Sequence, residues 1–223
     1  AVDLSASMAT QDMPAVGEGA EDNLVERMEL MRDMVGRFIE GRSGDRLALI
    51  GFATDAFLIV PLTYDAGAVS QTLHELRVGL PGRKTDLGRA IGLAVQTLKD
   101  APADDRLLAI LTDGQTNAGG LSALDAADLA ASAKIRIHMI GFAADIEPEN
   151  AEHMREIAER TGGRYHAATS ADALERAYAD IDAEATPRAR EAKSYLTRDL
   201  SWIPTLVAFG VMSWLGLREV REG

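Results

Sequence analysis

The run RLLAILTDG, residues 106–114, constrains the fold more than any other stretch of this chain. It is apolar up to its polar end, which is typical of a strand that helices cover on both faces of a parallel sheet. A strand covered on both faces lies in the middle of its sheet. We therefore expect an α/β domain in which residues 106–112 form a central strand.

Predicted helices and strands alternate along the rest of the chain. An apolar stripe recurs at steps of four and three (Leu24, Met28, Met31, Val35 and Phe38), which predicts a helix over 23–40 that ends at Gly41 and Gly44. Further helices are expected at 66–76, 86–99, 121–132, 150–161 and 171–185, and strands at 45–52, 56–63, 135–142 and 164–167. This alternation predicts a doubly wound, mostly parallel sheet with helices on both faces. Pro61 marks 56–63 as an edge strand, joined to 45–52 by the turn at Thr54-Asp55 as an antiparallel hairpin.

Residues 200–217, LSWIPTLVAFGVMSWLGL, contain no charged side chain. As a helix they would extend about 27 Å, close to the roughly 30 Å of a bilayer's hydrocarbon core. Trp202 and Trp214 lie near the two ends, as in an interfacial aromatic belt. We therefore expect a transmembrane helix, and a buried or interfacial helix is the alternative. The predicted organisation is a domain at 1–185, a linker at 186–199, the span at 200–217 and a tail at 218–223.

Basic residues flank this predicted span unequally. Four precede it (Arg188, Arg190, Lys193 and Arg198) and two follow it (Arg218 and Arg221). The positive-inside rule then favours a cytoplasmic domain. The chain also begins without an initiator Met and with a very short apolar stretch, so we expect an upstream segment to be missing.

Composition excludes several kinds of site. With 35 acidic and 23 basic residues, the net charge of −12 argues against a nucleic-acid partner. The 223 residues include no cysteine, which rules out disulfides, thiolate zinc sites and cysteine nucleophiles. Any site must therefore use oxygen or imidazole groups, and the four histidines show no metal-ligand spacing.

Oxygen-bearing side chains follow several predicted strands. Asp3, Ser5 and Ser7 leave the first strand, and Asp113 follows the buried strand 106–112. Ligands of open parallel sheets bind beyond the carboxyl ends of the strands, so these groups are expected in one crevice. Thr85, at the end of a Gly-rich loop, supplies a fifth oxygen. Two carboxylates and three hydroxyls suit Mg²⁺, or Mn²⁺ or Ca²⁺, and do not suit zinc or copper.

Each of these motifs also has a structural explanation when it is taken alone. Serine at a loop-to-helix junction and Thr85 before a helix are common caps, and Asp113-Gly114 is a common turn. It is their joint occurrence, each at its expected place in an α/β chain, that indicates a metal site.

On the basis of these motifs, residues 1 to about 185 resemble a von Willebrand factor type A (vWA) domain, which has a Rossmann-like fold. The likeness is to its metal-ion-dependent adhesion site (MIDAS), with Asp3, Ser5 and Ser7 as the first motif, Thr85 in KTDLGRAI as the second and Asp113 in LTDG as the third. Ser7-Met8, and Asn117 after LTDG, resemble the bacterial membrane-anchored Bat-type (aerotolerance-associated) branch. That resemblance implies an inner-membrane protein that acts with a MoxR-type AAA+ ATPase or other Bat-like vWA proteins. Arg83-Lys84 before Thr85 depart from the usual Gly-rich pattern.

The resemblance implies a binding module, not an enzyme, in which the metal captures an acidic side chain of a partner protein. It would serve the assembly or maturation of an envelope or redox complex. Two alternatives stay open: a metal-dependent phosphohydrolase with Asp3 as nucleophile, and an inert membrane scaffold. The first usually needs a second acid two residues on, where this chain has Ser5. GLPGRKT lacks the glycine that directly precedes the lysine of a nucleotide loop, and the chain has no Gly-x-Ser-x-Gly elbow.

Overall fold

The computed structural model describes residues 1–15, 23–42, 44–78, 84–102, 105–114 and 121–184. All of them belong to one compact unit, Ala1–Arg190. The predicted linker, span and tail (186–199, 200–217 and 218–223) lie outside the described residues. Among the helices that the structure describes, none is long and apolar enough to cross a bilayer.

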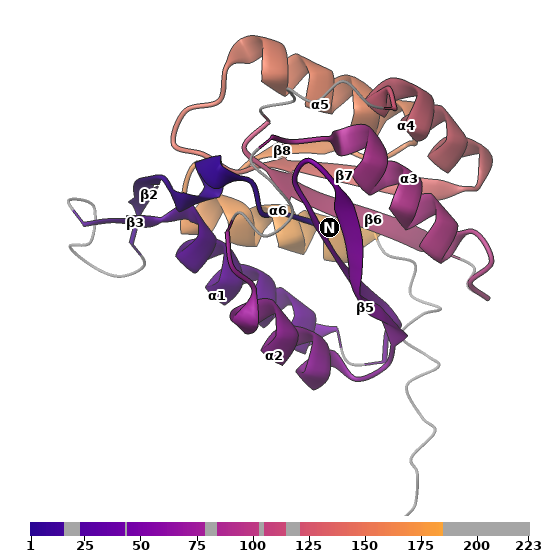
Figure 1. The fold of residues 1–223 in the computed structure, drawn as a ribbon, viewed down its shortest axis with the longest axis horizontal. Helices are drawn as coiled ribbons and strands as arrows, with labels where there is room; N and C mark the ends of the chain where they lie inside the picture. Colours follow the sequence, from indigo (N-terminus) through magenta and orange to yellow (C-terminus); the bar gives the residue numbers. More distant parts are fainter. Residues whose placement is uncertain (16–22, 43, 79–83, 103–104, 115–120, 185–223) are drawn as a thin grey trace, which may run out of the picture. The chain divides into compact units, whose positions relative to one another are not determined.

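A six-stranded sheet forms the middle of this unit (Figure 1). Its order is β5-β4-β1-β6-β7-β8. The strands are β1 (Val2–Asp3), β4 (Leu47–Phe52), β5 (Ala56–Thr63), β6 (Arg106–Thr112), β7 (Ile135–Gly141) and β8 (Tyr165–Ala167). Neighbouring strands are parallel except β4 and β5. The predicted α/β fold is therefore confirmed, with a mostly parallel sheet and an antiparallel edge strand that carries Pro61.

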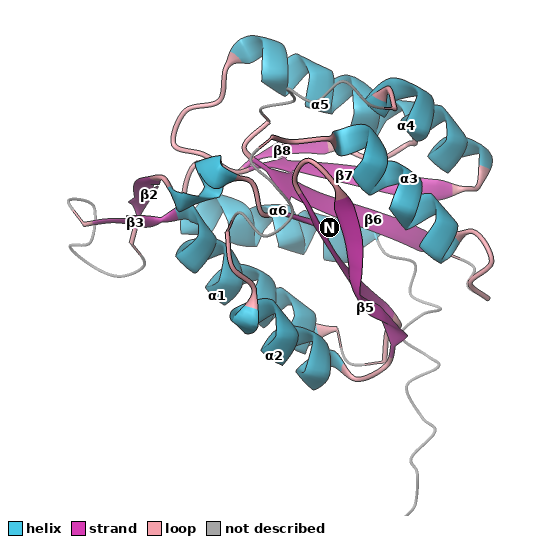
Figure 2. Cartoon of the chain, in the orientation of Figure 1, coloured by secondary structure: helices cyan, strands magenta, loops and turns pink. Residues whose placement is uncertain are grey.

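Helices cover both faces of this sheet (Figure 2). They are α1 (Arg27–Gly41), α2 (Ala66–Glu75), α3 (Leu87–Leu98), α4 (Ala123–Ser132), α5 (Pro148–Arg160) and α6 (Ala171–Glu184). Helices α1, α2 and α6 share one buried apolar cluster, which includes Met31, Leu73 and Leu174. Helices α3, α4 and α5 share a second cluster, which includes Ile91, Ala126 and Ile157. Two cores on opposite faces are what the doubly wound prediction requires.

Strand β6 lies between β1 and β7, as its apolar run predicts. Leu111 joins the cluster beneath α1, α2 and α6, whereas Leu108 and Ile110 join the cluster beneath α3, α4 and α5. Because successive side chains of a strand point to opposite faces, both faces must be apolar when both are covered. The polar end of the run, Asp113, then emerges at the carboxyl edge of the sheet.

The helix predicted over 23–40 starts later than expected. Residues Leu24–Glu26 form a short strand, β3, which pairs antiparallel with β2 (Gln11–Pro14) beside the start of α1 (Figure 1). Leu24 is 50% exposed, although Met28, Met31 and Val35 of the same predicted stripe are buried. Leu24 matched the helical period by position alone, and backbone pairing with β2 fixes its conformation instead. Neither this hairpin nor the 3₁₀ turn at Ala6–Ala9 was predicted from the sequence.

His138 of β7 is fully buried against the helix α6. Its ring stacks on His166 of β8 with the centroids 5.8 Å apart, and its Nε2 lies 3.6 Å from Glu184 Oε2. Neither ring nitrogen forms a hydrogen bond with the described residues. Burial lowers the pKa of His138 from 6.5 to about 4; the Glu184 carboxylate opposes that shift, and His166, Arg136 and Arg164 add to it.

We expect this histidine to make the fold sensitive to acid. Between pH 6.5 and about 4 the unfolded chain binds a proton at His138 that the folded chain does not, so stability falls as the pH falls through that window. Between pH 7 and pH 5 the group should cost about 2 kcal/mol of unfolding free energy. Urea unfolding of His138→Leu should give a pH profile flatter by that amount. An unchanged slope in His138→Leu would contradict this prediction.

Candidate metal centre

Asp3 ends β1 and lies in the middle of the sheet's carboxyl edge. It is paired with Phe52 of β4, and the preceding Val2 is paired with Leu111 of β6. Its Oδ1 accepts the backbone N–H of Ser5 at 2.8 Å and its Oδ2 accepts the hydroxyl of Thr112 at 2.7 Å. These bonds fix the orientation of a carboxylate that is fully buried.

Burial raises the pKa of Asp3 from 3.8 to about 6. The hydrogen bonds from Ser5 and Thr112 oppose that shift, and the negative charge of Asp113 adds to it. Thr112, the residue before Asp113, donates its hydroxyl to Asp3 Oδ2, so the two carboxylates follow neighbouring strands at the same edge of the sheet. Two buried acids at one edge repel each other, because their charges are poorly screened away from water, and a bound cation would relieve that repulsion.

Ser5 and Ser7 leave β1 in a tight turn. The 3₁₀ turn at Ala6–Ala9 is closed by Met8 N–H bonding to the Ser5 carbonyl. This turn places the two hydroxyl oxygens 3.0 Å apart. Ser5 is buried and Ser7 is half-buried. The turn thus presents a pair of neutral oxygens next to Asp3.

Asp113 follows β6, the strand next to β1, and its side chain is only 1% exposed. Its Oδ2 accepts a hydrogen bond from Arg27 Nη1 at 2.9 Å. Gly114 after it has a φ of +86°, which a residue with a side chain rarely adopts, and donates its N–H to the Thr112 hydroxyl at 3.2 Å. Thr112 thereby links the Asp113 turn to Asp3.

Thr85 is buried at the entrance to α3. The next residue, Asp86, donates its N–H to the Ala53 carbonyl at 2.8 Å, which ties this segment to the loop that follows β4. Since β4 is the other neighbour of β1, Thr85 lies at the same carboxyl edge as Asp3. The cap of α3 is Asp86, whose Oδ1 accepts the N–H of Arg89 at 2.9 Å, so a capping role does not explain Thr85. Residues 79–83 of the preceding loop lie outside the described residues.

The structure therefore brings four of the five predicted oxygen groups to one place through hydrogen bonds and strand order: Asp3, Ser5, Ser7 and Asp113. It places Thr85 at the same edge by strand order. No group of three or more His, Cys, Asp or Glu side chains suited to a metal occurs in the described part of the chain. An ion at this edge would have two carboxylates and would depend on hydroxyls and water for its other ligands. That donor set fits a hard divalent cation.

Sequence reasoning missed Arg27 and Asp12. Arg27 is buried and forms a two-point ion pair with Asp12 of β2, with Nε to Oδ1 at 2.8 Å and Nη2 to Oδ2 at 2.5 Å. The Arg27 guanidinium lowers the pKa of Asp12, and Asp12 in turn raises the pKa of Arg27. The feature of the sequence that could have pointed to Arg27 is its position directly before Met28, at the start of the predicted apolar stripe.

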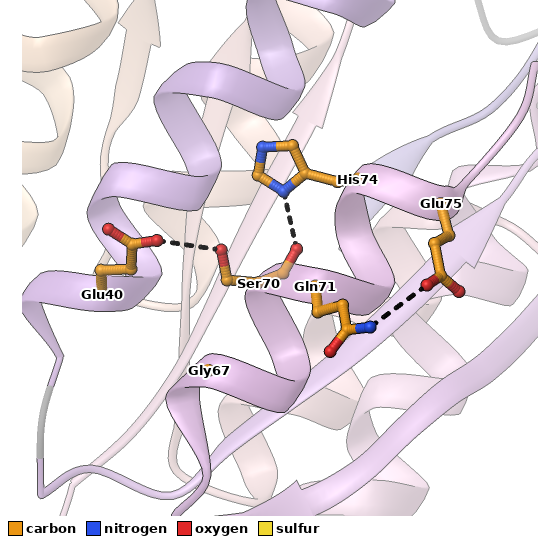
Figure 3. A pocket seen from close by; sticks show the side chains of 6 residues that line it. All are labelled: Glu40, Gly67, Ser70, Gln71, His74 and Glu75. Carbon is orange, nitrogen blue, oxygen red and sulfur yellow. Dashed lines mark hydrogen bonds between the residues drawn. The ribbon is translucent and has the colours of Figure 1, made fainter.

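A second candidate site is an open pocket of about 480 Å³ between α1 and α2 (Figure 3). Ser70 Oγ donates to Glu40 Oε1 at 3.3 Å, and His74 Nδ1 donates to the Ser70 backbone carbonyl at 2.8 Å. The imidazole thus bonds to the backbone and the serine hydroxyl bonds to a carboxylate. A serine nucleophile needs its hydroxyl on a base such as histidine, so this arrangement does not make Ser70 one.

Comparison with known proteins agrees with this fold. An aerotolerance-related membrane protein from Bacteroides fragilis superposes with a TM-score of 0.67, at 24% identity over 82% of this chain and 96% of that chain. Proximal thread matrix protein 1 from the mussel byssus, whose structure has a zinc-occupied MIDAS motif, has a TM-score of 0.62, at 19% identity over 81% of this chain and 43% of that chain.

A protein from Borreliella burgdorferi is 29% identical over 134 residues, which is 60% of this chain and 39% of that protein. The chain thus matches about two fifths of the length of this relative. Residues 1–180 match the family model "von Willebrand factor type A domain". This chain therefore belongs to the von Willebrand factor type A domain family.

Proposed function

We propose that the chain is a membrane-anchored, metal-dependent protein-binding module. Asp3, Ser5, Ser7, Thr85 and Asp113 would hold Mg²⁺, or Mn²⁺ or Ca²⁺ in its place, and the ion would supply a Lewis-acid position for a carboxylate of a partner protein. The observation that carries the proposal is that the buried carboxylates of Asp3 and Asp113 follow neighbouring strands at one edge of the sheet, with the Ser5 and Ser7 hydroxyls beside Asp3.

The charges of this set favour capture of an acid. Two carboxylates neutralise a divalent ion, and neutral hydroxyls donate weakly to it. An ion held in this way keeps electrophilic character and attracts a further anionic oxygen. The partner group of this proposal is therefore an Asp or Glu side chain.

The same geometry speaks against the phosphohydrolase alternative. The Ser5 N–H and the Thr112 hydroxyl hold the two oxygens of Asp3, and neither group is an acid that could protonate a leaving group. Ser5 occupies the position where a second acid would act on the leaving group. Turnover of phosphate esters that disappears in Asp3→Asn would favour the alternative.

We extend the proposal to location and partner. The apolar residues 200–217 would anchor the domain in a bacterial inner membrane, and the balance of flanking basic residues favours a cytoplasmic domain. The fold shared with an aerotolerance-related membrane protein supports this placement. A MoxR-type AAA+ ATPase, or another Bat-like vWA protein, is the proposed partner, in assembly or maturation of an envelope or redox complex.

Binding to a purified MoxR-type ATPase tests this proposal. A chelator alone is a poor control, because such an ATPase itself uses Mg²⁺ with its nucleotide. The wild-type chain and Asp3→Asn should therefore be compared in the same Mg²⁺ buffer. We expect binding by the wild type and a loss of at least about tenfold in the variant, since outer-shell changes alone often cost a metal site that much. Equal affinities would count against a metal-dependent contact.

A further inference from the structure

Arg27 joins three segments that surround the metal centre. Its backbone N–H donates to the Thr10 carbonyl, just after the turn that carries Ser7. Its guanidinium holds both oxygens of Asp12 on β2, and the remaining nitrogen, Nη1, donates to Asp113 Oδ2 at 2.9 Å. The side chain is 10% exposed, so these ion pairs are poorly screened by solvent.

The charges around Arg27 match those of a divalent site. Asp3, Asp12 and Asp113 carry three negative charges and Arg27 carries one positive charge, which leaves two negative charges in the cluster. The guanidinium of Arg27 thus holds a positive charge next to one oxygen, Oδ2, of the predicted metal ligand Asp113. Asp12 anchors it there through two parallel bonds, a geometry that a planar guanidinium favours.

We propose that Arg27 determines which divalent ion the centre selects, by restricting Asp113 to one-oxygen ligation. This inference rests on the proposed metal-binding function. A second cation brought to Oδ2 would be repelled by the guanidinium at short range, so an ion is directed away from that oxygen. An ion that needs both carboxylate oxygens loses most from this restriction.

Calcium and magnesium differ in this requirement. Ca²⁺ takes six to eight oxygen ligands and often binds a carboxylate through both oxygens, whereas Mg²⁺ demands octahedral geometry and keeps waters. A centre whose Asp113 can offer one oxygen therefore disfavours Ca²⁺ relative to Mg²⁺ and Mn²⁺. Arg27 is a positioning residue in this scheme and need not touch the ion.

The ratio of the Ca²⁺ and Mg²⁺ dissociation constants tests this role. General losses of stability or changes in net charge affect two divalent ions alike and cancel in the ratio. We expect Arg27→Met to lower the Ca²⁺-to-Mg²⁺ ratio about tenfold, because changes in the outer shell of a metal site typically alter affinity by roughly 10–100-fold. Arg37→Met is the matched control: it removes the same charge from an exposed position of α1 and should leave the ratio unchanged. Both constants are measured by calorimetric titration of the metal-free protein.

Two further variants keep the test decisive if Arg27→Met does not fold. Arg27→Lys keeps a cation near Asp113 and should retain a ratio between those of the wild type and Arg27→Met. Asp12→Asn leaves Arg27 on Asp113 with its charge no longer offset by Asp12, so both ions should bind about tenfold more weakly with the ratio at or above the wild-type value.

The outcomes separate the inference from the proposed function. A wild-type chain that binds neither ion overturns both. The wild-type chain could bind Mg²⁺ while folded Arg27→Met or Asp12→Asn variants keep the wild-type dissociation constants for both ions. That result would overturn only the role of Arg27.

Discussion

Replacing Asp3 by Asn is expected to abolish Mg²⁺ binding and to leave the metal-free domain at least as stable as the wild type. Outer-shell changes cost metal sites roughly 10–100-fold in affinity, and loss of a charged ligand should cost more than about 100-fold. Calorimetric titration of Mg²⁺ measures the first effect, and urea unfolding in the presence of a chelator measures the second.

The gain in stability follows from the burial of this carboxylate. The pKa of Asp3 is about 6 in the folded chain and 3.8 in the unfolded one, so at neutral pH the folded state bears the cost of a buried charge. An uncharged Asn removes that cost, worth about 1–3 kcal/mol. Its amide oxygen can still accept the Ser5 N–H, and its amide nitrogen can donate to the Thr112 hydroxyl.

Asp113→Asn provides a matched contrast. This variant should also lose Mg²⁺ binding, but its metal-free form should be less stable than the wild type, because the buried Arg27 loses one of its two anionic partners. Wild-type Mg²⁺ affinity in Asp3→Asn, or equal stability changes in the two variants, would contradict the roles assigned to these carboxylates.

Gly88→Ala is expected to be among the most destabilising single substitutions in the domain. A Cβ at this position of α3 would lie 1.9 Å from the Leu121 carbonyl oxygen and 2.7 Å from its carbon. Both are backbone atoms, so relief requires α3 to move away from the start of α4. Overpacking in cores usually costs 1–3 kcal/mol, and a backbone clash should cost at least about 3 kcal/mol.

Gly92→Ala on the same helix is the control. Its Cβ would lie 3.4 Å from Leu121 Cδ2, within van der Waals contact, and alanine in a helix interior gains about 0.5–1 kcal/mol over glycine. Urea unfolding should therefore show changes of opposite sign four residues apart. Because Thr85 lies at the start of α3, Gly88→Ala should also weaken Mg²⁺ binding. A Gly88→Ala protein as stable as Gly92→Ala would contradict the close packing of α3 on Leu121.

Local sequence patterns predicted most of this fold because burial on two faces leaves a strong signal. The apolar run of β6, Pro61 on β5 and the period of α1 from Met28 onward each reflect one dominant constraint. The β2–β3 hairpin gave no such signal, because its described strands are short and its pairing depends on backbone groups. Leu24 fits a helical period and is nevertheless in β3, which shows that one matching position does not define a helix end.

The candidate centre was only partly predictable for a similar reason. The carboxyl ends of β1 and β6 place Asp3 and Asp113 together by topology, which the alternation of elements implies. Arg27 escaped notice because its role depends on the hairpin that brings Asp12 to it. The N-cap of α3 is Asp86 and not Thr85. Which side-chain oxygen accepts the Arg89 N–H depends on the residue at which the helix starts, and the sequence alone does not fix that residue.

Anomalous diffraction from crystals grown with Mn²⁺ tests the central claim most directly. We predict one strong manganese peak at the carboxyl edge of the sheet, about 2 Å from oxygens of Asp3, Ser5, Ser7, Thr85 or Asp113 or from waters bound to them. A manganese peak elsewhere on the domain, or none at this edge at saturating Mn²⁺, would contradict the assignment of these five residues.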